Sequence, residues 1–489
     1  MTTIAIPTKQ PKGLYPLFFA EMWERYGFYS VQFLLVLFLT NHFGFTDDKA
    51  YVLYGGFAAL VYLTPIFGGY VADHLLGFRR AIYLGAIFYI VGYSMLAILE
   101  AKGFYYSLAC LIVGNGFFKG NVSSLLGTLY HENDPRRDSG FTIFYIGINT
   151  GGILASLVAS FLAVHYGWYA PFAVAGLGML VGFINLVRAA KRLGDHGLPP
   201  YPERLQKHFM GITYTHLVWI GTILAVIAVA ALLHVPEMLR IIYGIIGALV
   251  LLTMIGLAFR YPTEQRNKIF ALIILVMVSM LYWALFGQMY SSVTLFVERS
   301  VDRHIFGYLM PAPVFIGIEG FGVLIFGAIM SKFWIWLESK GYHIAVAYKF
   351  AIGLLVMGIA FAVLKLGIVF SIGTSVSAWW TVLFFLLFAI SELALSPIGL
   401  SMITILAPKE WVGMMMGVWF LSLSVGFGFG GQLARLSDIP ADMNNASLQV
   451  AATYGHTFMI FAVIGIVAGF IVIALGPWLT KLSRTGKVE

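Results

Sequence analysis

Long runs of hydrophobic residues, separated by short polar segments, recur along the whole chain. A nearly uncharged run of about 20 residues is long enough for a helix to cross the hydrocarbon core of a bilayer. The pattern predicts about fourteen such helices, near residues 15–40, 51–73, 80–99, 104–130, 139–164, 168–187, 211–233, 237–259, 267–297, 308–336, 344–364, 378–407, 411–433 and 453–481. We therefore expect an all-α polytopic membrane protein.

The composition excludes a soluble globular protein. Of the 489 residues, 60% are hydrophobic and 11% are charged, whereas soluble domains are about half apolar and about a quarter charged. The net charge of +8 does not indicate nucleic-acid binding, because the basic residues lie in the polar breaks and form no basic helix. The first apolar run contains Glu21, Glu24 and Arg25, which a cleavable signal peptide would not tolerate, so the first helix is expected to be retained.

The distribution of charge along the chain predicts its orientation and its division. With both termini in the cytoplasm, about twenty Lys and Arg residues face that side and about seven the other, as the positive-inside rule requires. The longest polar break, at residues 191–208, is followed by two helices with almost no ionisable residues, which we interpret as an insertion. The prediction is a six-helix bundle at 14–190, a linker with two inserted helices at 191–266 and a second six-helix bundle at 267–483. Two six-helix halves are expected of a transporter that rocks around a site at the membrane midplane.

Ionisable residues at membrane depth are the main functional candidates, because each costs several kcal/mol unless it is paired or hydrated. There are six of them, namely Glu21, Glu24, Arg25, Lys119, Glu319 and Glu392. Since four acids face two bases, some carboxylate should carry a proton part of the time. This is the composition of a proton-coupled site. With the single cysteine and no metal-ligand cluster or nucleophile–base pair at membrane depth, neither a metal, a cofactor nor an enzyme is predicted.

The first helix carries a polar face. Glu21, Arg25, Tyr29 and Gln32 follow one another at intervals of three or four residues, with Glu24 nearby, so they project from nearly one side. The alternative is that Glu21 and Arg25 neutralise each other as a packed ion pair.

The other charges have neighbours that bear on their roles. Lys119 is surrounded by glycines that permit close helix approach, although a lysine could instead extend to the membrane surface. Glu392 precedes Ser396 and Pro397, and a proline frees a backbone carbonyl in mid-helix, which makes Glu392 the best candidate for a cation partner. Glu319 also lies among glycines, and a coupling role and a hydrogen bond to nearby backbone are equally compatible with it.

Three segments resemble signature motifs of the proton-coupled oligopeptide transporters of the major facilitator superfamily. Residues 21–25 resemble the ExxER motif of the first helix, residues 118–121 the lysine segment of the fourth, and residues 144–151 the FYxxINxG signature. Residues 69–80 also resemble the superfamily loop between the second and third helices, with His74 where arginine is usual. The resemblance covers essentially the whole chain.

The resemblance implies roles for individual residues. Arg25 and Lys119 would bind the peptide carboxylate, while Glu392 and Asn149 would bind the peptide amino group. The peptide backbone and side chains would meet Tyr29, Gln32, Tyr62, Trp283 and Ser396; the alternative for Trp283 is an ordinary core or interface residue. Opposite charges would thus recognise both ends of a zwitterion.

Three positions depart from the family pattern. Gln32 stands where many members carry a second arginine, Phe286 and Gly287 where many carry an acid, and Ala312 where an asparagine is expected. The arginine and the acid are missing together, so neither charge is left without its partner. We suggest that Glu319 takes over part of the missing acidic function.

The sequence therefore predicts a symporter that imports di- and tripeptides with protons by alternating access. It would be a monomer in a bacterial inner membrane, with peptides and the lipid bilayer as its partners, no nucleic acid and no cofactor except the coupling proton. The alternatives are a symporter of the same fold for nitrate, another organic anion or a peptide-like drug, and a non-concentrative channel or receptor.

Overall fold

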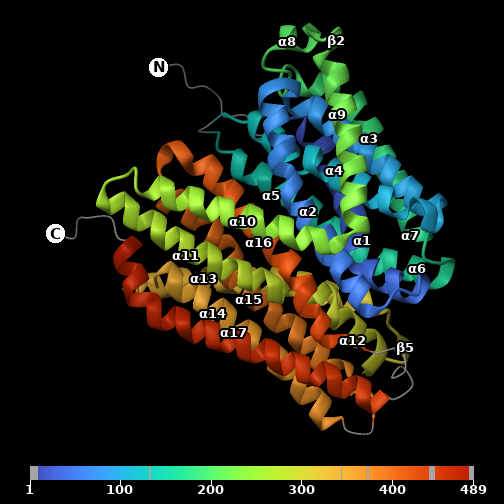
Figure 1. Cartoon of the computed structure of the whole chain (residues 1–489), viewed down its shortest axis with the longest axis vertical. Helices are drawn as coiled ribbons and strands as arrows, with labels where there is room; N and C mark the ends of the chain where they lie inside the picture. Colours follow the sequence, from blue (N-terminus) through green and yellow to red (C-terminus); the bar gives the residue numbers. More distant parts are fainter. Residues whose placement is uncertain (1–8, 132–133, 343, 372–373, 440–446, 484–489) are drawn as a thin grey trace. The chain divides into compact units, whose positions relative to one another are not determined.

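The structure is a computed structural model that describes residues 9–131, 134–342, 344–371, 374–439 and 447–483. The described chain is almost entirely helical, as expected (Figure 1). The long helices of the first part are α1 (Leu14–Leu37), α2 (Asp47–Val71), α3 (Gly77–Ile98), α4 (Glu100–Thr128), α5 (Arg137–Leu154), α7 (Ala170–Arg188) and α9 (Tyr214–His234). Those of the second part are α10 (Pro236–Ala258), α11 (Thr263–Phe286), α13 (Ala312–Ser339), α14 (Val346–Phe370), α15 (Ala378–Leu406), α16 (Val412–Ala434) and α17 (Ser447–Ser483).

Short helical segments extend or connect these helices. They are η1 (Phe38–His42), η2 (Ala72–Leu76), η3 (Ala155–Ala159), α6 (Ser160–Tyr166), η4 (Ala190–Leu193), α8 (Pro202–Gln206), η5 (Gly287–Tyr290), α12 (Ser292–Ser300), η6 (Lys409–Trp411) and η7 (Arg435–Ser437). Thus η3 and α6 continue α5, and α12 follows α11 through η5. Each predicted membrane helix corresponds to one of the long helices or to such an extended helix.

The apolar character of these helices supports membrane insertion. Within the described residues, eleven uninterrupted helical stretches are long and apolar enough to cross a membrane. One of them, Asp47–Ile98, contains both α2 and α3. The charged helices α1 and α4 are not among the eleven, because ionisable and polar residues lower their hydropathy. The chain is therefore an all-helical, multi-pass membrane protein.

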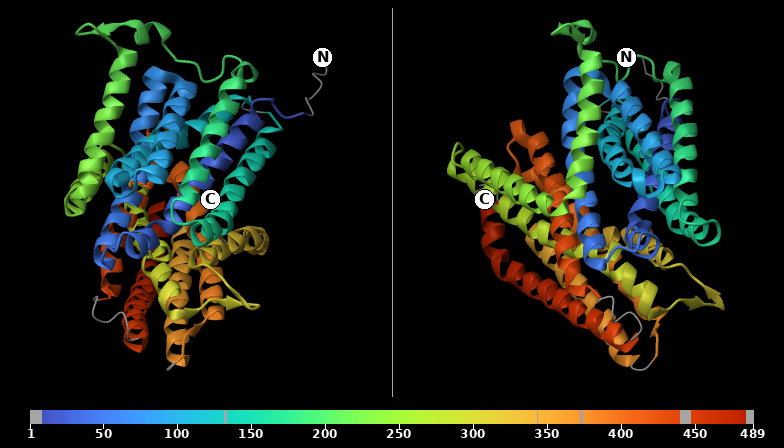
Figure 2. Two further views of the ribbon diagram at one scale, coloured as in Figure 1. Left: turned by 90° about the vertical axis from the view of Figure 1, so that its right-hand side faces the viewer. Right: turned by 45° about the vertical axis from the view of Figure 1, so that its right-hand side comes forward.

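Among the described residues, six strands of two residues each form three pairs. β1 (His208–Phe209) pairs with β2 (Ile212–Thr213), and β4 (His304–Ile305) with β5 (Tyr308–Leu309), both antiparallel. β3 (Val301–Asp302) pairs in parallel with β6 (Val376–Ser377). All three pairs lie in connections outside the long helices, and the β4–β5 hairpin projects from its helices in Figure 2.

Contacts group the chain into two compact units. Unit 1 comprises residues 1–34 and 60–235, and unit 2 comprises residues 35–59 and 236–489. In unit 1, α3 packs between α4 and α7, and α9 packs on α4. Small residues permit this packing, since a Cβ atom on Gly85 would lie 2.7 Å from the backbone oxygen of Gly114.

In unit 2, α14 packs against α15 and α17, and α11 packs against α16 (Figure 1). Here also a glycine allows close approach, because a Cβ on Gly465 would lie 2.9 Å from the Cα of Gly358. Pro397 lies inside α15 without ending the helix.

The two inserted helices pack in different units. α9 lies on α4 in unit 1, whereas α10 lies on α11 and α16 in unit 2. The hydroxyl of Tyr243 on α10 donates to the backbone oxygen of Gly56 at 3.1 Å. The division at 14–190, 191–266 and 267–483 remains a prediction, and the terminal residues 1–8 and 484–489, whose side of the membrane was predicted, lie outside the described residues.

Candidate functional site

Helix α1 buries three of the six ionisable residues expected at membrane depth. Glu21 and Glu24 are 0% exposed and Arg25 is 4% exposed. The guanidinium of Arg25 donates two hydrogen bonds of 2.5 Å to the carboxylate of Glu24. Its Nε atom also lies 3.6 Å from Oε1 of Glu21. The arginine is therefore shared by two glutamates, with Glu24 the closer partner.

Lys119 on α4 completes this group of charges. Its Nζ atom donates to Oε1 of Glu21 at 2.9 Å, and its side chain is 33% exposed. Lys119 thus points to a carboxylate and does not extend to the membrane surface. We call Glu21, Glu24, Arg25 and Lys119 the α1 cluster. Its two acids and two bases balance in charge, although Oε2 of Glu21 is buried without a hydrogen-bond partner among the described residues.

Two polar residues that the sequence did not single out support the α1 cluster. The hydroxyl of Tyr89 on α3 donates to Oε1 of Glu24 and lies 3.0 Å from Oδ1 of Asn115 on α4. The amide of Asn115 donates to the backbone oxygen of Val61 at 2.7 Å. Tyr89 and Asn115 are polar residues within apolar runs, which was the available signal. Tyr89 thus donates to the same carboxylate oxygen of Glu24 that accepts a hydrogen bond from Arg25, and Asn115 contacts Tyr89.

The FYxxINxG signature has a packing role beside α1. A Cβ atom on Gly151 would lie 2.4 Å from the backbone oxygen of Met22 and 2.7 Å from the Cβ of Arg25. A Cβ on Gly147 would lie 2.9 Å from the ring of Phe18. These two glycines therefore let α5 approach α1 at the level of the charged residues.

The other residues of unit 1 that were predicted to belong to the site lie in different environments. The guanidinium carbon of Arg25 lies 5.7 Å from the ring centre of Tyr29. Gln32 is buried and Tyr62 is half-buried. The amide of Asn149 donates to the backbone oxygen of Tyr145, one turn earlier on its own helix, at 2.8 Å. Tyr29 is thus beside Arg25, while the amide of Asn149 forms a hydrogen bond within α5.

In unit 2, the remaining two acids lie together. The carboxyl groups of Glu319 on α13 and Glu392 on α15 are hydrogen-bond partners. Glu319 is 8% exposed, and Glu392 is half-buried near the middle of α15. No lysine or arginine forms an ion pair with either acid in the part of the chain that the structure describes. We call Glu319 and Glu392 the carboxyl pair.

Other predicted residues of unit 2 lie in or near its core. Trp283 is buried, with its ring centre 5.2 Å from that of Phe286 and 6.2 Å from that of Phe427. Ser396 is half-buried one turn after Glu392, and Ala312 is the first residue of α13. Trp283 therefore has the contacts of a core residue here, and its role in a peptide pocket stays a prediction.

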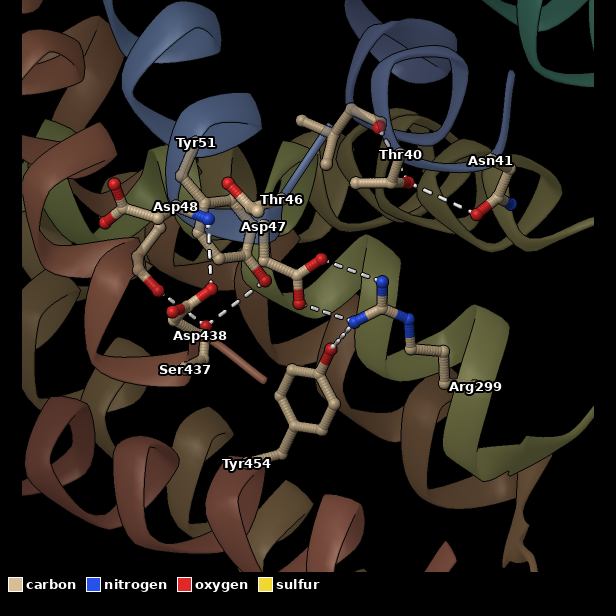
Figure 3. Close-up of polar contacts among 12 residues, drawn as sticks. Thr40, Asn41, Thr46, Asp47, Asp48, Tyr51, Arg299, Ser437, Asp438 and Tyr454 are labelled. Carbon is tan, nitrogen blue, oxygen red and sulfur yellow. Dashed lines mark hydrogen bonds and ion pairs between the residues drawn. The ribbon is translucent and has the colours of Figure 1, made fainter. Parts of the chain in front are cut away.

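A third polar group joins the start of α2 to the helices of unit 2 (Figure 3). Arg299 on α12 binds the carboxylate of Asp47 with contacts of 2.5 and 2.8 Å and lies 3.3 Å from the hydroxyl of Tyr454 on α17. Both charges also interact favourably with the dipoles of their helices, because Asp47 is in the first turn of α2 and Arg299 is in the last turn of α12. We call these residues, together with Asp48, Arg435 and Asp438, the Asp47 network.

The acids of the Asp47 network differ in environment. The guanidinium of Arg435 donates to the carboxylate of Asp48, whose backbone N–H donates to Oδ1 of Asp438 at 3.0 Å. Partial burial, together with the nearby charges of Asp47 and Asp48, raises the pKa of Asp438 above its ordinary value. The hydrogen bond from Asp48 and the charge of Arg435 act in the opposite direction.

The geometry is that of a secondary transporter. Both units bury ionisable side chains on long apolar helices, and no group of three or more His, Cys, Asp or Glu residues in the described ranges could hold a metal ion. The chain belongs to the POT family, PTR2, whose sequence profile matches residues 79–455. It is accordingly a transporter and not an enzyme, and the resemblance seen in its motifs is confirmed.

Relatives and solved structures match nearly the whole chain. Dipeptide and tripeptide permease B of Salmonella typhimurium is 31% identical over 484 residues, covering 98% of both chains. Dipeptide and tripeptide permease A of Cronobacter turicensis is 31% identical over 487 residues, covering 98% of this chain and 95% of the relative. A crystal structure of a peptide transporter POT in complex with sulfate has 29% identity and a TM-score of 0.82, covering 98% of this chain and 97% of the other. A POT family transporter in complex with 5-aminolevulinic acid has 26% identity and a TM-score of 0.83, covering 97% and 99%.

Proposed function

We propose that the chain imports di- and tripeptides together with protons, by alternating access, across a bacterial inner membrane and with both termini in the cytoplasm. Membership of the POT family and the full-length similarity to dipeptide and tripeptide permeases support the substrate class. The α1 cluster supports the coupling to protons.

The observation that carries this proposal is that each base of the α1 cluster is held by a buried glutamate. Arg25 is bound to Glu24, and Lys119 is bound to Glu21. A peptide carboxylate that replaced one of these acids would add a negative charge to a balanced cluster in a medium of low dielectric constant. Protonation of Glu21 or Glu24 would restore the balance and free a base for the peptide. Uptake of a peptide carboxylate and uptake of a proton are therefore coupled.

The amino group of the peptide would be bound in unit 2. Glu392 is a half-buried acid without an ion-pair partner among the described residues, so it can accept an ammonium group. Asn149, Tyr29, Gln32, Tyr62, Trp283 and Ser396 are proposed as further contacts of the peptide. Glu392, with Glu319 as its neighbour, is also proposed to take part in proton coupling.

The driving force is sufficient for concentrative uptake. One proton moving through 100 mV supplies about 2.3 kcal/mol, and each unit of pH difference adds about 1.4 kcal/mol. Together they support accumulation of a few hundredfold for each proton. No nucleotide is required.

Uptake of labelled dialanine into proteoliposomes tests the proposal. We expect accumulation that depends on an inward proton gradient and disappears when an ionophore collapses the gradient. Glu392→Gln should reduce uptake to near background, because an amide cannot balance the charge of the peptide ammonium group. Glu338→Gln, at the exposed end of α13, is the matched control and should transport normally.

The alternatives predict different results. Equilibration that ignores the gradient would indicate a channel or an uncoupled carrier. Folded protein that takes up no dialanine, but takes up nitrate, another organic anion or a peptide-like drug with protons, would contradict the peptide assignment. The complex of a POT relative with 5-aminolevulinic acid makes small zwitterions the first such solutes to test.

A further inference from the structure

The carboxyl pair raises a question of protonation that the proposed function leaves open. A carboxylate accepts hydrogen bonds but cannot donate them, so two carboxyl groups can be hydrogen-bond partners only when one of them carries a proton. Glu319 and Glu392 are such partners. When carboxylate oxygens are counted as acceptors alone, Oε1 of Glu319 is buried without a donor among the described residues. A proton located between the two acids removes this deficit.

The packing of α13 and α15 brings the two acids together. A Cβ atom on Gly322, one turn after Glu319, would lie 2.7 Å from the Cβ of Ala389, which is one turn before Glu392. The glycine therefore allows the two helices to approach closely at the level of the pair. The hydroxyl of Tyr282 on α11 is near both acids and is 3.3 Å from the hydroxyl of Ser391.

The charged groups on the neighbouring helices have other neighbours or lie in the first turns of their helix. On α12, Arg299 binds Asp47, and Glu298 lies 3.1 Å from Arg303. On α14, Lys349 lies 4.9 Å from the ring of Trp334, and the Nζ atom of Lys365 lies beside Gly455 of α17. The charged residues of α11, namely Glu264, Arg266 and Lys268, are in its first turns, and α16 has no titratable residue. Within the described chain, Tyr282 is thus the titratable neighbour of the pair, and it supplies no positive charge.

The two acids differ in their access to water and ligand. Glu319 is 8% exposed, whereas Glu392 is half-buried. A negative charge is less costly on the more hydrated group, so the proton belongs on Glu319 and the charge on Glu392. Glu319 then donates to the carboxylate of Glu392, and the hydrogen bond favours the ionised form of Glu392.

We propose that Glu319 is a positioning residue that keeps its proton throughout transport and, by donating a hydrogen bond, holds Glu392 ionised and oriented for the peptide amino group. This inference rests on the proposed function and assigns different roles to the two acids. Glu392 exchanges between a proton and the peptide ammonium group, while Glu319 does neither. Glu319 therefore compensates for the absent acid near Gly287 as a neutral donor and not as a second carrier of the transported proton.

The test compares two substitutions of Glu319 by the pH dependence of the KM for dialanine uptake. Glu319→Gln keeps a neutral N–H donor, so its KM should stay within about twofold of wild type at every pH. Glu319→Leu removes the donor, so Glu392 should take up a proton more readily. A hydrogen bond to an ionised group corresponds to a shift of about one to two pH units. The acidic limb of the KM profile should move upward by that amount, with KM raised about tenfold or more at the acidic end of the profile.

Two controls separate this mechanism from a general defect. Glu338→Leu makes the same change at the exposed end of α13 and should leave the profile unchanged. N-acetyl-dialanine, which has no ammonium group, should compete weakly and equally with all variants. Monodispersity in detergent is measured for each variant.

The possible outcomes distinguish the inference from the proposed function. If wild type takes up no dialanine, the proposed function fails. If wild type transports but Glu319→Gln loses more than tenfold in affinity or loses concentrative uptake, Glu319 must ionise and the inference is wrong. If Glu319→Leu has the wild-type profile, the hydrogen bond has no role and the inference is also wrong. If Glu319→Leu does not fold, the profile of Glu319→Gln alone decides.

Discussion

The α1 cluster and the carboxyl pair place buried charge in the two units in opposite ways. In the α1 cluster, Glu21, Glu24, Arg25 and Lys119 balance one another, and each base contacts an acid. In the carboxyl pair, two acids face each other and no base pairs with either within the described residues. A balanced cluster can exchange one anion for another when a proton arrives, whereas two acids alone need a retained proton to remain together. In the proposed function, binding of the two ends of a peptide would therefore place different demands on protonation.

The largest expected effect comes from breaking the balance of the α1 cluster. Arg25→Met leaves the fully buried Glu24 without its cation, and the free energy of unfolding should fall by about 3–5 kcal/mol. Uptake of dialanine should fall to background. Thermal unfolding in detergent and proteoliposome uptake measure the two effects. The double variant Glu24→Gln/Arg25→Met should regain most of the stability but no transport. If the single and double variants were equally stable, the charges of Glu24 and Arg25 would not balance each other.

The Asp47 network should show an intermediate effect, because its central ion pair is less buried. The side chains of Arg299 and Asp47 are 23% and 5% exposed. A double-mutant cycle with Asp47→Asn and Arg299→Met should give a coupling energy of about 1–3 kcal/mol from the unfolding midpoints. Ser437→Ala, near the same helix ends, serves as the control for a neutral change. Additive single effects would mean that the two charges do not stabilise unit 2 together.

The carboxyl pair should respond to neutralisation in the opposite sense from the α1 cluster. Glu319→Gln retains a donor and removes the need for a bound proton, so the unfolding midpoint should be unchanged or slightly higher. Glu21→Gln is the matched comparison, since it removes the acid that binds Lys119 and should lower the midpoint. Thermal unfolding of both variants is measured under identical conditions. If the unfolding midpoint falls as much in Glu319→Gln as in Glu21→Gln, the carboxyl pair and the α1 cluster do not differ in their response to neutralisation.

The smallest expected effect concerns Asp438. Its raised pKa means that the folded state binds a proton more readily than the unfolded state, so ionisation of Asp438 costs stability at neutral pH. That cost disappears as the pH falls through the raised pKa. Asp438→Asn should therefore raise the unfolding midpoint slightly at pH 7, and the difference from wild type should shrink as the pH approaches 4. A difference that stays constant over this range would show that the charge of Asp438 is not responsible.

The helices were predictable because a membrane imposes a simple pattern. Each apolar run had to form a helix, so their order and approximate ends followed from polar breaks alone. Errors were local. The first helix was expected to continue to residue 40, but α1 ends at Leu37 and a π-helical turn, η1, follows. The two-residue strands were not predicted, since so short a segment has no alternation to detect.

The partners of the charged residues were only partly predictable. Spacing placed Glu21 and Glu24 near Arg25, but it could not show that Lys119 binds Glu21 or that Tyr89 binds Glu24, because those contacts depend on how α3 and α4 pack. The same is true of Glu319 and Glu392, which are remote in sequence and meet through α13 and α15. The motifs indicated candidate residues, and tertiary packing determines what each one contacts.

The assignment of residues 35–59 to unit 2 has a consequence for dividing the chain. A break between α9 and α10, at Val235 and Pro236, would give two polypeptides that differ from the two contact units, because the first would still carry residues 35–59. Unit 2 could then form only with a segment supplied by the other fragment. Two separately expressed fragments should accordingly reconstitute when produced together, and the second fragment alone should be the less stable product.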